Sequence, residues 1–188
     1  YACIHRRGKV IAPDLKESAA NMNKKRVMTN RVYRWSRILS MLGLATGSAQ
    51  AVTYVWDGGG ADNNWSSSTN WNPDTAVPAS ASNTVVQLDG TLRVTSAQNV
   101  ASPFVLNELD FKGSGSPFTL NGNPLQFVAN GATQPRITHP RTTGVYINNA
   151  IDIPAGTTLN LQLETQDISF NGAISGGGSI DRLLAYNG

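Results

Sequence analysis

From Val52 onward, apolar residues recur with period two or in short bursts, and helical spacing never persists for long. Such alternation over three to five residues predicts short β-strands. The clearest runs are residues 85–88, 92–94, 109–111, 118–120, 125–127, 145–147, 151–153, 159–163 and 168–170. Between them lie Asn-Gly, Asp-Gly and Gly-rich pairs, which tolerate the positive φ of tight turns. The pattern therefore predicts an all-β chain of many short strands.

Two architectures are built from short strands and frequent turns, a β-sandwich and a β-solenoid. Residues 109–113, 118–122 and 168–172 share an apolar-polar-apolar triplet that a glycine follows two residues later. This loose repeat, roughly 20 residues per turn, favours the solenoid, because one coil cannot bury its apolar side alone and must stack on its neighbours. We expect the start of a right-handed parallel β-helix over residues 84–188, with the sandwich as the alternative. A Trp/Gly/Asn-rich N-terminal cap is expected over residues 52–83.

The segment before Val52 has the order of a secretory signal peptide. A basic stretch over residues 24–37 precedes an apolar run over 38–45, and Ala49 and Ala51 then supply the small residues of a cleavage site. The apolar run is far shorter than the ~20 residues that a bilayer-spanning helix needs. We expect a helical signal peptide at residues 22–51, cleaved after Ala51, and a disordered upstream leader at 1–21.

Charge separates these two parts of the chain. The formal net charge is +3, but residues 1–51 hold ten Lys/Arg against two acidic residues, and residues 52–188 hold five against ten. The leader is therefore at +8 and the remainder at −5. An acidic segment with scattered cations repels phosphate backbones, so nucleic acid is not an expected partner.

Candidate chemistry after Ala51 is sparse. The single cysteine, Cys3, lies in the leader, so we expect no disulfide, metal site or cofactor in the remainder. The spacing of the aspartates at 57, 62, 74 and 89 matches no calcium loop and indicates turn-capping carboxylates. Glu108 and Asp110 share one face of a predicted strand, which is formally a glycosidase pair but is more simply explained by solvent-facing acids. His139, beside Pro140, is expected to be a loop histidine.

Two stretches carry a family resemblance. Residues 54–66 read YVWDGGGADNNWS and are followed by Asn70-Trp71, and residues 170–180 read FNGAISGGGSI. Both resemble bacterial autotransporter-associated β-strand repeat proteins, where such a series opens the passenger and such a phrase begins the repeat. The chain departs from that family at residues 181–184, which read DRLL where the repeat continues through a Lys-Thr-Gly turn. The resemblance implies a large exported protein whose C-terminal anchor lies beyond Gly188.

These observations predict an exported passenger segment at the bacterial outer membrane or in the medium, with a structural, adhesion or display role and no catalysis. Expected partners are cell-surface glycans or other surface proteins, with membrane contact only through export and the anchor. One alternative is the N-terminal part of a β-helical polysaccharide-degrading enzyme. Another is a carbohydrate-binding module that stacks sugars on Trp56, Trp65 and Trp71, since indole faces suit pyranose rings. Against that reading, the same tryptophans would cap the open end of a solenoid.

Overall fold

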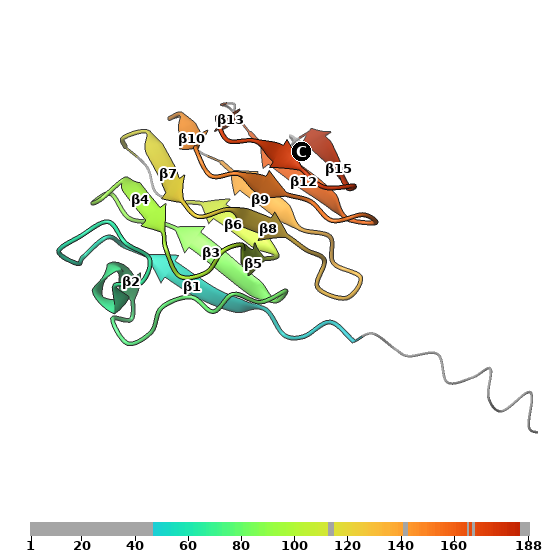
Figure 1. Cartoon of the computed structure of the whole chain (residues 1–188). Helices are drawn as coiled ribbons and strands as arrows, with labels where there is room; N and C mark the ends of the chain where they lie inside the picture. Colours follow the sequence, from blue (N-terminus) through green and yellow to red (C-terminus); the bar gives the residue numbers. More distant parts are fainter. Residues whose placement is uncertain (1–46, 113–114, 141–142, 165, 167, 185–188) are drawn as a thin grey trace, which may run out of the picture. The chain divides into compact units, whose positions relative to one another are not determined.

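The computed structural model describes residues 47–112, 115–140, 143–164, 166 and 168–184 (Figure 1). The predicted leader, 1–21, and residues 22–46 of the predicted signal peptide lie outside the described residues. Fifteen strands and one short 3₁₀ helix, η1 (Ser68–Asn70), make up the regular structure of the described part. The chain is therefore all-β there, as the alternating pattern predicts.

The strands form three sheets. The largest has seven strands, whose order is β15 (Ser179–Leu184), β12 (Thr158–Leu163), β9 (Arg136–His139), β6 (Glu108–Phe111), β3 (Thr84–Leu88), β1 (Val52–Trp56) and β2 (Trp71–Asn72). A second sheet has the order β13 (Ile168–Phe170), β10 (Val145–Ile147), β7 (Phe118–Gly122) and β4 (Thr95–Gln98). The third has the order β14 (Ile174–Ser175), β11 (Ile151–Asp152), β8 (Leu125–Phe127) and β5 (Phe104–Leu106).

The chain visits the three sheets in turn and then returns to the first, one rung higher. Every pairing between successive rungs is parallel. The register joins Val86 to Leu109, Leu109 to Ile137, Ile137 to Leu161, and Leu161 to Arg182, so the rungs are 23, 28, 24 and 21 residues long. This is a parallel β-solenoid of about four turns, which confirms the stacked coil and excludes the sandwich.

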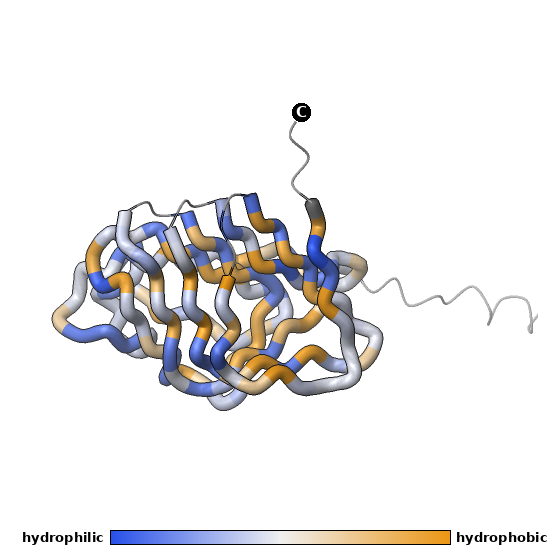
Figure 2. Tube along the Cα trace, turned by 90° about the horizontal axis from the view of Figure 1, so that it is seen from above, coloured by the Kyte–Doolittle hydropathy of each residue, from blue (hydrophilic) through white to orange (hydrophobic). Residues whose placement is uncertain are grey.

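Alternation along each strand builds the core. In β3 and β12 every second residue is buried, and Figure 2 shows hydrophobic and hydrophilic segments alternating along the stacked strands. The inward side chains of successive rungs stack on one another, and each buried Val, Leu, Ile or Phe contributes about 1.5–3 kcal/mol. Short strands suffice because the stabilising contacts run along the stack and not along the strand.

One predicted strand is absent. The alternating residues Leu92, Arg93 and Val94 lie outside any strand, and β4 begins only at Thr95. Arg93 has a φ of 46°, a left-handed conformation that ends extended structure. Two hydrogen bonds tie Arg93 to the segment around β1. The Arg93 carbonyl accepts the indole N–H of Trp56 at 3.3 Å, and the Arg93 Nε donates to the Gly60 carbonyl at 2.6 Å.

Asparagines stack at the corner between the second and third sheets. The Asn148 carboxamide donates to Asn121 Oδ1, and the Asn171 carboxamide donates to Asn148 Oδ1, both at 2.7 Å. Asn121 is the next-to-last residue of β7, and Asn148 and Asn171 directly follow β10 and β13, so the parallel register brings the three side chains into one column. The three carboxamides therefore form a hydrogen-bonded ladder that joins three successive rungs at this corner.

The excursion between β1 and β3 covers the first rung. In the seven-stranded sheet, β2 pairs antiparallel with β1. In the second sheet the outer edge of β4 is bonded at Ala97, whose N–H donates to the Asn63 carbonyl and whose carbonyl accepts from the Trp65 N–H. In the third, Val105 of β5 is bonded to Ser80 and Ala81. One segment, residues 57–83, therefore satisfies all three starting edges.

Candidate functional site

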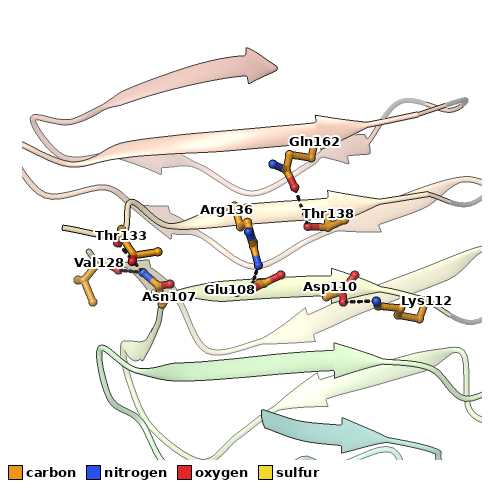
Figure 3. A network of polar contacts seen from close by, with 9 residues as sticks. All are labelled: Asn107, Glu108, Asp110, Lys112, Val128, Thr133, Arg136, Thr138 and Gln162. Atoms are coloured by element: carbon orange, nitrogen blue, oxygen red, sulfur yellow. Dashed lines mark hydrogen bonds and ion pairs between the residues drawn. The ribbon is translucent and has the colours of Figure 1, made fainter. Parts of the chain in front are cut away.

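The outer face of the seven-stranded sheet carries the candidate carboxylates Glu108 and Asp110, with the cations Lys112 and Arg136 beside them (Figure 3). Outward positions stack in columns because the strands are parallel and in register. One column runs from Glu108 to Arg136, and the next contains Asp110 and Thr138. This face is the candidate functional site.

Glu108 and Arg136 form an ion pair across two rungs. Arg136 donates to Glu108 Oε2 at 2.8 Å, and this hydrogen bond raises the pKa of the guanidinium. The Arg136 side chain is 45% exposed, so solvent screens the pair and its net contribution to stability is below about 1 kcal/mol. A carboxylate held in this way is poorly placed to act as a nucleophile or base.

Asp110 is the most unusual group on this face. It is only 6% exposed, and burial raises the pKa of its carboxyl, while the nearby Lys112 ammonium opposes that shift. Its Oδ2 lies 3.3 Å from Lys112 Nζ, and among the described residues its Oδ1 has no hydrogen-bond partner. The expectation of a solvent-facing acid is therefore wrong for Asp110. Because Oδ1 is shut off from solvent, a substrate could reach it only if the side chains around it moved.

The three candidate carbohydrate-stacking tryptophans pack against one another at the first rung. Trp56 and Trp65 are fully buried and Trp71 is 1% exposed. Trp71 stands edge-on to both other rings, with centroid distances of 5.2 and 5.4 Å, and its indole donates to the Trp65 carbonyl at 2.8 Å. A sugar-stacking platform needs an exposed ring face, which these indoles do not offer in this structure. Their packing is that of a lid over the end of the core.

Two of the four predicted turn aspartates, Asp57 and Asp62, hold loops of the cap. Asp62 accepts hydrogen bonds from Asn64, Ser67 and Asn70, and these bonds, led by the Asn64 backbone N–H, lower the pKa of the Asp62 carboxyl. Asp57 accepts from the Gly59 N–H at 2.9 Å. In the part of the chain that the structure describes, no three His, Cys, Asp or Glu side chains gather as metal ligands would.

His139 corrects the expectation of a loop histidine. It is the last residue of β9, fully buried, and it pairs in register with Leu163 of the next rung. Its ring stands edge-on to Phe111 with a centroid distance of 6.1 Å. Sequence reasoning placed it in a loop because Pro140 follows it, but the proline ends the strand one residue later. His139 is a core residue at an inward position.

The predicted cleavage residues lie just before β1. Ala49 and Ala51 are both exposed, and the Ala49 backbone hydrogen-bonds to Asn130, a contact that sequence reasoning missed. The only available signal was the Asn-Gly pair at 130–131, which indicates a turn but not what the turn contacts.

No helix within the described ranges is long and apolar enough to cross a membrane. Comparison with family models, with curated proteins and with solved structures gave no match.

Proposed function

We propose that this chain is an exported β-solenoid segment that presents its sheets outside the cell in a structural, adhesion or display role, without catalysis. The observation that carries the proposal is the parallel, in-register stacking of the rungs. Residues 57–83 bond to the edges of the first rung, and each rung stacked on it extends the outer faces of the three sheets. A surface that grows in this way with every rung suits a role in presentation.

The chemistry of the outer face supports a role in presentation over one in turnover. Glu108 is engaged by Arg136, and Asp110 is covered, so neither carboxylate is offered to a substrate. Thr138 and Gln162 continue the face as neutral polar groups, 3.4 Å apart. A regular, internally paired polar surface needs no ligand to be stable, and this is what a display scaffold requires.

Export is supported by the order of the leader and by the acidic, cysteine-free composition after Ala51. The resemblance of residues 54–66 and 170–180 to autotransporter-associated β-strand repeats adds the finer proposal of a bacterial passenger. In that case the solenoid is right-handed, as nearly all parallel crossover connections are. Its anchor in the outer membrane would be supplied by a part of the protein that follows these rungs.

Secretion of the full chain from a Gram-negative host tests the export proposal. We expect the product outside the cytoplasm, with a mass that corresponds to cleavage after Ala51. Leu42→Arg interrupts the apolar run and is expected to keep the chain inside, while Leu92→Arg, at a position that is 63% exposed, is the matched control. Unprocessed wild-type chain confined to the cytoplasm would contradict the proposal.

The non-catalytic role needs its own assay. The secreted chain, incubated with neutral and acidic polysaccharides, is expected to release no new reducing or unsaturated ends. Beads coated with the same protein are expected to adhere to cells or to immobilised surface glycans. Release of oligosaccharide that Asp110→Asn abolishes would favour the enzyme and overturn the proposal.

A further inference from the structure

A short arm, defined as residues 48–50, lies against the turn between β8 and β9. The Ala49 N–H donates to Asn130 Oδ1 at 3.0 Å, and Asn130 Nδ2 donates back to the Ala49 carbonyl at 2.6 Å. One carboxamide thus satisfies both backbone groups of a residue 81 positions earlier in the chain. This pairing imitates the way an antiparallel strand recognises its neighbour.

The Asn130 side chain is held in place by its own turn. Its backbone N–H and carbonyl exchange hydrogen bonds with Thr133 at 2.9 and 3.0 Å. The Asn107 carboxamide fixes the same turn from the core side, donating to the carbonyls of Val128 and Thr133 at 2.8 and 3.2 Å (Figure 3). A carboxamide positioned by these contacts loses little further freedom when it binds a backbone.

Two neighbouring residues complete the slot. Gly131 has a φ of 60°, and a Cβ on it would lie 2.9 Å from the Ser48 Cα, so a glycine is needed for the close approach of the arm. Asn83 Nδ2 donates to the Gln50 carbonyl at 2.7 Å. The slot therefore contacts Ser48, Ala49 and Gln50 mainly through their backbone.

We propose that Asn130, Gly131 and Asn83 form a binding slot for an extended peptide segment, which the arm fills in the precursor. This inference rests on the proposed export, because cleavage after Ala51 removes the arm with the signal peptide. Asn130 is only 7% exposed with the arm in place, so departure of the arm uncovers a pre-positioned carboxamide that has lost its two hydrogen bonds to Ala49. The occupant of the processed chain is an extended stretch of a partner polypeptide with a small residue facing Gly131.

Binding of the arm sequence in trans tests the slot. The probe is the peptide Gly-Ser-Ala-Gln-Ala, residues 47–51 with blocked ends, added to isotope-labelled chain that has been secreted and shown by mass to begin at Val52. We expect saturable NMR shifts at the side-chain amides of Asn130 and Asn83. The affinity is expected to fall at least about tenfold with Asn130→Ala, since two hydrogen bonds are lost.

Three controls make the result specific. A peptide N-methylated at the residue equivalent to Ala49 lacks the donor and is expected to bind at least about tenfold more weakly, with the protein unaltered. Asn148→Ala, which removes another corner carboxamide, is expected to bind the peptide as wild type does. The unprocessed chain is expected to show no shifts, because its own arm occupies the slot at high effective concentration.

The outcomes separate this inference from the proposed export. Processed chain that shows no shifts, or shifts that survive Asn130→Ala, would overturn the slot. A chain that keeps its leader would contradict the proposed cleavage instead, and would contradict the proposed export if it is also confined to the cytoplasm. In that case Asn130→Ala in the full chain is expected to release the arm and to speed amide exchange at Ala49 at least about tenfold, and unchanged exchange would overturn the slot.

Discussion

The first and the last rung of this solenoid each have one outer strand edge in every sheet, and the two sets of edges differ in what covers them. At the first rung, residues 57–83 bond to an edge of each sheet and bring Trp65 and Trp71 over the core beside Trp56 of β1. At the last rung, β13, β14 and β15 are the terminal strands of their sheets, and Ile174 and Ile180 are 47% and 41% exposed. Within the residues that the structure describes, the inward pattern continues to the last rung, whereas the cover does not.

The difference shows that rung sequence alone does not decide where such a fold is stable. Ile180 pairs in register with Leu159, which is fully buried, although both residues are apolar and occupy equivalent positions. What buries Leu159 is the rung above it. An inward residue therefore contributes its full hydrophobic free energy only when both neighbouring layers are present.

The largest effect is expected at the closed end. Trp71→Ala removes a buried indole that packs against Trp56 and Trp65, and we expect a loss of about 3–5 kcal/mol in the free energy of unfolding. Urea denaturation followed by circular dichroism measures it. Leu92→Ala, on an exposed side chain in a neighbouring loop, is the control and is expected to change stability by less than about 0.5 kcal/mol. An equal loss of stability in Trp71→Ala and Leu92→Ala would contradict a stabilising role of the cap.

A matched pair of substitutions compares one position with and without a rung above it. Leu159→Ala is expected to cost about 2–5 kcal/mol, because the cavity it leaves is enclosed. Ile180→Ala, one rung later in the same column, is expected to cost less than about 1 kcal/mol. The same denaturation assay decides the point, and equal costs would mean that the last rung is already covered.

The asparagine column offers a smaller comparison between interior and end. Asn148→Ala breaks two side-chain hydrogen bonds, to Asn121 and to Asn171, and is expected to cost about 1–2 kcal/mol. Asn171→Ala breaks only its bond to Asn148 and is expected to cost about half as much. Thermal unfolding of the two variants tests this order. Equal melting temperatures for wild type and both variants would show that the asparagine column does not stabilise the fold.

The smallest effect concerns pH at Asp110. Its folded pKa is raised above the unfolded value by burial, so ionisation destabilises the folded state, and stability is lost as pH rises from about 3.8 through the folded pKa. Asp110→Asn removes this titration. We therefore expect the variant to gain stability relative to wild type as the pH increases across that interval. A difference in urea midpoint that stays constant with pH would contradict the assignment.

Much of the fold could be predicted from residues 84–188 because a solenoid repeats one simple rule. Alternating triplets such as 118–120 face the core in every rung, and Asn and Gly mark the corners. The predictions failed where a long-range contact overrides the local pattern. Arg93 adopts positive φ because the cap uses its carbonyl, and His139 is buried because the register aligns it with Leu163.

The candidate site was less predictable than the fold. Period two placed Glu108 and Asp110 on one face, but the partner of Glu108 lies 28 residues away, and the alternation does not show that Asp110 is only 6% exposed. The contact of the arm with Asn130 spans 81 residues and leaves no periodic signal. Such contacts depend on how many residues each turn of the coil contains, and that number varies from rung to rung in this chain.

Hydrogen–deuterium exchange of the full chain tests the contrast between the two ends most directly. The account predicts that amides of β3, β4 and β5 exchange as slowly as those of β6, β7 and β8, because the cap protects the first rung, whereas β13, β14 and β15 exchange much faster. Equal protection of the first and last rungs in a monomeric sample, or faster exchange in β4 and β5 than in β13 and β14, would contradict it.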